Sequence, residues 1–296
     1  MFVFVGFGIV IACVLGGYVA MGGHLEVLMQ PFEFVIIGGA ALGAFIASNS
    51  TQTHVLKGSL SSFKILLAGK KYKTQDYLEL LSALYSLFRL IKTKGELAIE
   101  SHIERPEESA LFQHFPRFLK NHEAVHFVCD YMRLVTLGSK NPFEIDALMD
   151  EEIDTLRKEK AHVPHAIQNV ADAMPALGIV AAVLGVIKTM GAIKEPPEVL
   201  GHLIGGALVG TFLGVLLSYG FIAPIAAAVK AAAEAEVKYF ECMRQGILAY
   251  LNGCAPQVAV EFARKVLTHD VRPSFEEVEK ATAEAADSVP ALAKAA

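Results

Sequence analysis

The chain has 296 residues, of which 53% are hydrophobic and 19% are charged. Its mean hydropathy of +0.43 is high for a water-soluble domain and indicates segments that lie in a membrane. The formal charge of −5 argues against nucleic-acid binding, which requires a concentrated basic surface. The 4 cysteines have no C-x-x-C spacing, so the sequence predicts neither a metal site nor a disulfide framework.

The N-terminal segment predicts two membrane crossings. Residues 1–23 contain no charged side chain and lack the basic region of a cleaved signal peptide, so we expect a retained transmembrane helix. A polar outer turn containing Glu26 and Glu33 follows. Residues 34–47 are apolar and glycine-rich, but they are short for a crossing unless flanking residues extend the helix.

Residues 57–161 are polar and predict a compact helical domain between the second and third crossings. Thr74 is suited to cap a helix that ends near Gly95. One face of this helix is apolar and comprises Tyr77, Leu80, Leu81, Leu84, Leu87, Phe88 and Ile91. The run Asn141-Pro142-Phe143-Glu144 places a cap, a first-turn proline and a glutamate in the order of another helix start.

The two most apolar segments, residues 173–193 and 199–229, are separated by a short polar break. Each is long enough to cross a hydrocarbon core of about 30 Å as a helix. The first carries one charge, Lys188, and the second carries no Asp, Glu, Lys or Arg. We therefore predict four crossings in total.

The fourth crossing carries small residues at every fourth position. They are Gly206, Gly210, Gly214 and Ser218. Such a strip lets membrane helices approach closely, so we expect it to be a packing face.

The distribution of basic residues predicts the topology. Most of the 26 Lys and Arg residues lie between residues 49 and 172 or after residue 229, and the loop at 25–33 has none. The positive-inside rule then puts the large domain, the tail and both termini in the cytoplasm.

The expected architecture is an all-α membrane protein with four transmembrane helices, a large helical cytoplasmic domain between helices 2 and 3, and a helical cytoplasmic tail. The predicted boundaries are residues 1–50 for crossings 1 and 2, 51–170 for the domain, 171–229 for crossings 3 and 4, and 230–296 for the tail. The fourth membrane helix is expected to continue into the tail. There, Ser274-Phe275-Glu276-Glu277 is a second capping box, and the stretch around Pro290 is expected to be frayed.

The predicted crossings contain no Asp or Glu well inside them, although an ion carrier normally needs a carboxylate at membrane depth. If the chain conducts ions, a partner helix must supply that group. Thr211 is placed to line such a path, or alternatively to bond to its own helix backbone. Pro175 and Pro224 are interpreted as functional kinks or as ordinary packing kinks, which membrane helices tolerate.

The sequence has no phosphate-binding loop and no membrane-hydrolase motif. We therefore expect neither enzymatic activity nor a cofactor. The charges that alternate in sign between Arg89 and Arg105 are typical of a solvated loop, and equally of a surface that docks a charged partner.

The third crossing contains MPALGIVAAVLGV at residues 174–186, and the fourth contains VGTFLGVLLSYG at 209–220. These two runs resemble the third and fourth helices of the MotA family of flagellar stator subunits, which is related to the TolQ and ExbB proteins. The resemblance extends to shorter runs at 143–152, 251–253, 260–265 and 272–275, so it covers nearly the whole chain.

This resemblance implies a ring of MotA-type subunits around two copies of MotB, whose helix supplies the intramembrane aspartate. Proton flow, with sodium less favoured, would drive the ring against FliG of the rotor. The functional prolines of the family match Pro175 and Pro224, its pore threonine matches Thr211, and its rotor-contacting glutamate matches Glu100. Its basic rotor-contact position, commonly Arg, is Lys92 here. Lysine keeps the charge but lacks the planar fork of arginine, so we expect a contact that is weaker or carried partly by Lys94 or Arg89.

Two other functions remain open at this point. A TolQ/ExbB-like energiser of the outer membrane would share the last two helices, but that group typically has three crossings. A passive scaffold or small-molecule transporter would not depend on a carboxylate-bearing partner, and no inverted repeat is evident. The location expected is the bacterial inner membrane, in contact with lipid.

Overall fold

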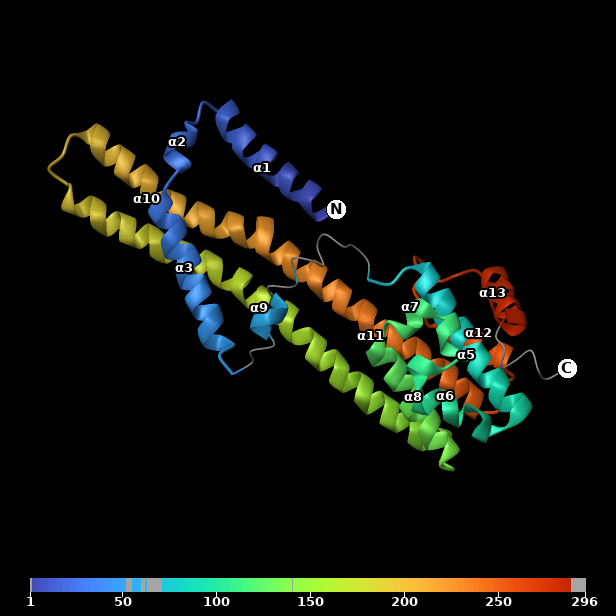
Figure 1. Cartoon of the computed structure of the whole chain (residues 1–296). Helices are drawn as coiled ribbons and strands as arrows, with labels where there is room; N and C mark the ends of the chain where they lie inside the picture. The colour runs from blue at the N-terminus through green and yellow to red at the C-terminus, as the bar shows by residue number, and fades with distance from the viewer. Residues whose placement is uncertain (1, 52–54, 60–61, 63–70, 140, 289–296) are drawn as a thin grey trace. The chain divides into compact units, whose positions relative to one another are not determined.

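The computed structural model describes residues 2–51, 55–59, 62, 71–139 and 141–288, and within these ranges every regular element is a helix (Figure 1). The chain divides into two compact units. Residues 1–69 and 160–233 form the first, which we call the spanning unit, and residues 70–159 and 234–296 form the second, which we call the polar unit. The expected domain boundaries at residues 50, 170 and 229 differ from the unit boundaries at residues 69, 159 and 233 by 19, 11 and 4 residues, respectively.

Among the residues that the structure describes, four helical stretches are long and apolar enough to cross a membrane, which confirms the number of crossings predicted. They are Phe2–Ala20, Leu25–Ser48, Pro142–Gly191 and Pro197–Leu251. The second stretch consists of the short α2 (Leu25–Leu28) and α3 (Pro31–Ser48). The expected outer turn is therefore mostly helical, and it extends the short second crossing.

The third crossing is the later part of a single helix, α9, which runs over 50 residues from Pro142 to Gly191. Its start is as predicted, because the Asn141 side chain accepts a hydrogen bond from the Phe143 amide (3.2 Å) and donates one to Glu144 (2.8 Å). No separate helix start precedes the apolar segment, so the polar and apolar parts of α9 are continuous.

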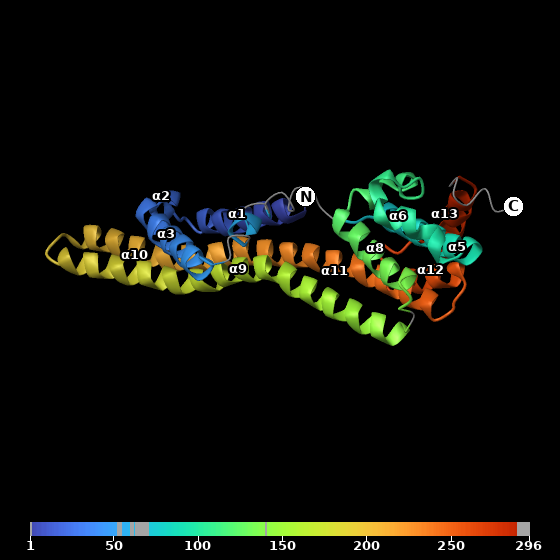
Figure 2. The same ribbon diagram turned by 60° about the horizontal axis from the view of Figure 1, so that its bottom comes forward.

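The fourth crossing also continues past its apolar segment, as predicted. It begins as α10 (Pro197–Leu217), passes through a π-helical segment, η4 (Ser218–Ile222), and continues as α11 (Ala223–Leu251). Both views show α10 antiparallel to the later half of α9, with α3 crossing over the pair (Figures 1 and 2). Helix α1 (Phe2–Ala20) contacts η4.

The polar unit has an aromatic and aliphatic core built around α5 (Thr74–Lys94). The predicted apolar face of α5 is fully buried, which confirms its orientation. Around it lie η1 (Glu96–Ile99), α6 (Glu100–Glu104), η2 (Pro106–Glu108), η3 (Phe112–His114), α7 (Pro116–Leu119), α8 (His122–Thr136), α12 (Pro256–Lys265) and α13 (Phe275–Ser288).

The ends of α5 and α13 test the predicted caps. Gly95 ends α5 with φ of +86°, as expected for a residue without a side chain. The expected cap at Thr74 is wrong by one residue, because the Asp76 carboxylate accepts from the amide of Lys73 at 2.7 Å and Thr74 is already helical. The capping box before α13 is confirmed by reciprocal bonds between Ser274 and Glu277 (2.6 and 3.1 Å). The stretch around Pro290 lies outside the described residues.

Candidate functional site

Helices α9 and α10 approach each other through facing small residues. A Cβ atom added to Gly210 would lie 3.0 Å from the Cβ of Ala181, and one added to Gly214 would lie 2.6 Å from the carbonyl oxygen of Met174. From the other side, a Cβ on Gly178 would lie 2.7 Å from the carbonyl oxygen of Gly210. These backbones are too close for any side chain at these positions.

The glycines of α9 that face the small residues of α10 were not predicted from the sequence. Gly178 and Gly185 both face α10, and a Cβ on Gly185 would lie 2.7 Å from the Cβ of Ala207. Their spacing of 7 residues, two helical turns, is the signal that would have identified them as a second packing face.

The N-terminal part of the α10 strip faces a different neighbour. A Cβ on Gly206 would lie 3.0 Å from Nε2 of Gln30, and one on Gly210 would lie 2.7 Å from Oε2 of Glu33. Gly210 therefore lies between α9 and α3. Glu33, which the sequence pattern assigns to an outer turn, lies instead against the uncharged part of α10.

Ser218 donates a hydrogen bond to α9 at the position where Pro175 interrupts the backbone hydrogen bonds of that helix. Pro175 has no N–H, so it cannot donate to the carbonyl of Ala171 four residues earlier. The buried hydroxyl of Ser218 donates to that oxygen at 2.6 Å. The π-helical segment begins at Ser218, and Pro224 follows as the second residue of α11.

Thr211 is half-buried on α10, and its Cα lies 3.3 Å from a Cβ placed on Gly178, one turn along α9 from Pro175. Within the described residues the Thr211 hydroxyl makes no hydrogen bond, whereas Thr189 donates to the carbonyl of Gly185 at 2.9 Å. The alternative in which Thr211 bonds to its own helix is therefore not what the structure contains. Its hydroxyl is available to another partner.

Lys92 and Glu100 lie close along the chain on the polar unit. Lys92 is in the last turn of α5, and Glu100 begins α6 after the turn at Gly95 and the short η1. Both side chains are exposed, and neither makes an ion pair or side-chain hydrogen bond with the described residues. The buried side chains of Ile99 and Ile103 fix the backbone beneath Glu100.

The neighbouring Glu104 differs from Glu100 because its carboxylate is paired with a cation of the polar unit. Its carboxylate accepts a hydrogen bond from Arg133 Nε at 2.7 Å, and Arg133 also contacts Asp130 at 2.6 Å. The hydrogen bond that Arg133 donates to Glu104 raises the pKa of Arg133 above its usual value. Glu100 thus presents a negative charge that makes no ion pair with the described residues.

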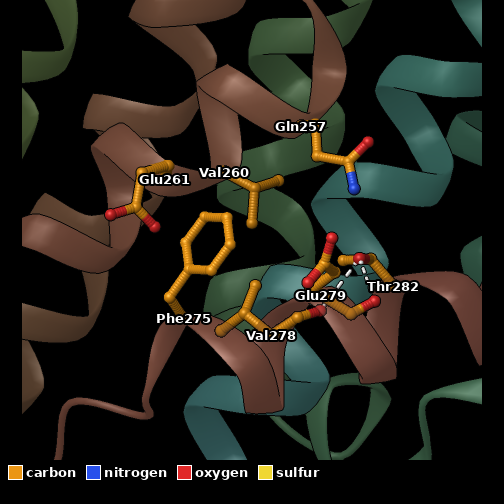
Figure 3. A pocket seen from close by; sticks show the side chains of 7 residues that line it. All are labelled: Gln257, Val260, Glu261, Phe275, Val278, Glu279 and Thr282. Carbon is orange, nitrogen blue, oxygen red and sulfur yellow. Dashed lines mark hydrogen bonds between the residues drawn. The ribbon is translucent and has the colours of Figure 1, made fainter.

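The polar unit also contains a pocket lined by side chains of α12 and α13 (Figure 3). It is lined by Gln257, Val260, Glu261, Phe275, Val278, Glu279 and Thr282. The Thr282 hydroxyl already bonds to the carbonyls of Val278 and Glu279 at 2.8 and 3.0 Å. None of the predicted site residues lines this pocket.

The fold and these contacts define a multi-pass membrane protein with close-packed, proline-interrupted helices and an accessible hydroxyl on one of them. Residues 4–95 match the family described as motility protein A N-terminal, and residues 119–242 match the MotA/TolQ/ExbB proton channel family. Motility protein A of Salmonella typhimurium is 44% identical over 95% of this chain and 94% of its own length. Motility protein A of Escherichia coli is 42% identical over the same shares.

The chain belongs to the motility protein A family, the stator subunits of the flagellar motor. Chemotaxis protein LafT of Vibrio parahaemolyticus is 34% identical over 95% of this chain and 98% of its own length. These relatives, matched along nearly the whole chain, favour a stator subunit over a TolQ/ExbB-like energiser.

Two solved structures share the fold. C. jejuni MotAB matches with a TM-score of 0.72 at 20% identity, over 92% of this chain and 98% of that chain. The MotAB stator complex from Bacillus subtilis matches with a TM-score of 0.68 at 24% identity, over 94% and 98%. The family and the four apolar helices indicate a multi-pass protein of the inner membrane.

Proposed function

We propose that this chain assembles with a MotB-type partner into a transmembrane proton channel and converts ion flow into torque on the flagellar rotor. The relatives support the motor role, and the C. jejuni and B. subtilis proteins are MotAB complexes. The observation that carries the channel role is the unbonded hydroxyl of Thr211, one helical turn from the level of Pro175.

The partner's contribution follows from what α9 and α10 lack. Neither residues 173–187 of α9 nor residues 203–217 of α10 contain an ionisable side chain. A carboxylate that carries protons past Thr211 must therefore come from another helix, and the MotB aspartate fits this requirement. Each proton that crosses releases about 2.3 kcal/mol per 100 mV of membrane potential.

Proton binding would be coupled to movement through helix packing. Neutralising the partner carboxylate changes how it packs beside Pro175 and Thr211. The small-residue contacts at Gly178, Gly210 and Gly214 have few interlocking side chains, so they allow α9 and α10 to shift against a partner helix. The continuous helices α9 and α11 join the spanning unit to the polar unit.

The polar unit would deliver this movement to FliG of the rotor through Lys92 and Glu100. Their exposed and unpaired charges support a docking role, because they need not be freed from internal ion pairs. Each surface ion pair contributes only about 0–1 kcal/mol. Rapid engagement and release during rotation requires contacts of this strength.

The proposed topology has both termini and the polar unit in the cytoplasm, as the positive-inside rule indicates. The apolar side chains of the spanning unit support contacts with lipid and with other copies of the chain in a ring. Examples are Ile187, Leu208 and Ile179, which are 62%, 63% and 56% exposed.

Complementation with charge variants tests the proposed rotor contact. In cells that lack this gene, wild type is expected to restore swimming, and Glu100→Lys is expected to reduce it strongly without reducing the amount of protein in the membrane. Glu276→Lys is a matched control, because Glu276 is also an exposed acid in the first turn of a helix of the polar unit. Equal swimming by both variants would remove Glu100 from the rotor contact.

A further inference from the structure

Glu33 has a buried carboxylate oxygen that the channel described above does not use. Its Oε2 atom is fully buried and has no hydrogen-bond partner among the described residues. A Cβ atom on Gly210 would lie 2.7 Å from this oxygen. The carboxylate therefore occupies the space that the missing side chain of Gly210 leaves free.

The usual structural roles of an acid in the first turn of a helix do not account for this position. The N-terminus of α3 has no side-chain cap, although a carboxylate at this position often provides one. Glu33 also makes no ion pair with the described residues. The nearby Gln30 donates from Nε2 to the carbonyl of Val27 at 3.2 Å, so its amide is engaged within its own segment.

The contact lies at depth along the fourth crossing. Gly210 is 12 residues inward from Glu198 in the sequence, which corresponds to about 18 Å along a helix. The uncharged segment of the fourth crossing continues beyond Gly210 as far as Val229.

No other ionisable group occurs at this level on the elements packed around Glu33. The charged or titratable groups of α2, α10 and the α9 end of the hairpin are Glu26, Glu198, His202 and Lys188, and all of them lie towards the outer ends of their elements. Residues 34–48 of α3, 173–187 of α9 and 203–217 of α10 contain none.

A carboxylate oxygen that is buried without a partner is costly, and a glutamine would fill the same space without carrying a charge. Ionisable groups inside a membrane bundle are rare and mark ion pathways. The side chains of Gln30 and Glu33 lie against Gly206 and Gly210, and Thr211 is the next residue of α10. Gln30 and Glu33 thus lie one helical turn apart along α10, and Glu33 lies against the residue that precedes Thr211.

We propose that Glu33 is an ion-binding residue of the channel, supplied by this chain itself, and that it precedes the partner's aspartate on the inward path. The inference rests on the proposed channel function. The carboxylate binds a proton from the outer side to give the neutral acid, and then releases the same proton towards the carboxylate beside Thr211. No other bond forms or breaks.

The first test measures rotation of beads on flagella in stator-less cells that express the chain with its MotB-type partner. Glu33→Gln keeps the shape but cannot carry a proton, so the rate at low load is expected to fall by about tenfold or more. Glu33→Asp keeps the carboxylate and is expected to restore part of the rate. Glu26→Gln, an exposed acid on α2, is the matched control and should rotate like wild type.

The outcomes separate this inference from the proposed function. If wild type fails to rotate the beads, the stator proposal itself is wrong. If wild type and Glu33→Gln rotate equally fast, only the role of Glu33 is wrong. Replacing sodium with potassium in the medium should leave the rate unchanged, and loss of rotation would show that the carboxylate binds sodium instead of a proton.

A second test uses only the wild-type protein, so it does not depend on whether a variant folds. Dicyclohexylcarbodiimide reacts with protonated carboxyl groups within membranes, so the wild-type complex should form an adduct at Glu33 that mass spectrometry detects. Labelling should increase as the outer pH is lowered, and Glu26 serves as the internal comparison because it is exposed to water. Absence of an adduct at Glu33 across the pH range would overturn the inference.

Discussion

The hydrogen bond from Ser218 to Ala171 allows the role of the proline in α9 to be tested quantitatively. Pro175 leaves the carbonyl of Ala171 without its helical donor, and the buried Ser218 hydroxyl donates to it at 2.6 Å. Ser218→Ala would leave this buried carbonyl unsatisfied. The cost is about 1–3 kcal/mol in water-soluble proteins, while interhelical bonds in membranes average about 0.6 kcal/mol. We therefore expect a loss of about 1 kcal/mol in stability.

A double-mutant cycle isolates this effect from other consequences of the substitution. Pro175→Ala restores an N–H that can donate to Ala171, so Ser218→Ala should cost little in that background. The assay is thermal unfolding of the purified complex for wild type, both single variants and the double variant. Ser48→Ala is the control, because Ser48 is exposed and its hydroxyl bonds within its own helix, to Ala44 at 2.8 Å. Equal losses in both backgrounds would refute this reasoning.

Two further predictions concern packing and pH. Gly214→Ala puts a Cβ 2.6 Å from the Met174 carbonyl oxygen, so it should lower both swimming speed and the amount of assembled complex. In the control variant Gly201→Ala, the added Cβ meets nothing within 4 Å and should have no effect. Equal effects of the two variants in swimming and co-purification assays would contradict the close approach of α9 and α10. Burial, and after it the positive charge of Lys94, lower the pKa of His102 below 6.5, and its Nδ1 lies 2.8 Å from the Ser109 hydroxyl. The unfolded chain then binds the additional proton, so stability from His102 is present above pH 6.5 and is lost as the pH falls below it. Thermal unfolding of wild type and His102→Gln should diverge above pH 6.5 and converge in acid, and parallel curves would show that His102 is not held neutral.

Local sequence patterns were sufficient to predict the four crossings, the buried face of α5 and the caps at Asn141 and Ser274. Each of these features depends on residues within a few turns of one another, so spacing alone carries the information. The cap at Lys73 was misplaced by one residue, because Thr74 is the commoner capping type and the Asp76 carboxylate decides the geometry.

The contacts of the candidate site depend on residues far apart in the sequence. The polar character of Glu33 indicated an outer turn, but its side chain lies against Gly210 of α10. The bond between Ser218 and Ala171 joins residues 47 positions apart, and the π-helical segment at residues 218–222 has no established sequence signature. The family resemblance predicted roles for Pro175 and Thr211, but not the neighbours that surround them.

The most direct test of the central claim is the rotation of single flagella in stator-less cells while this chain is induced together with its MotB-type partner. We expect immobile flagella to begin to rotate, speed to rise in discrete steps as units are added, and removal of the partner's intramembrane aspartate to abolish rotation. Flagella that stay immobile with both proteins present in the membrane, or that rotate equally well without the partner's aspartate, would contradict the central claim.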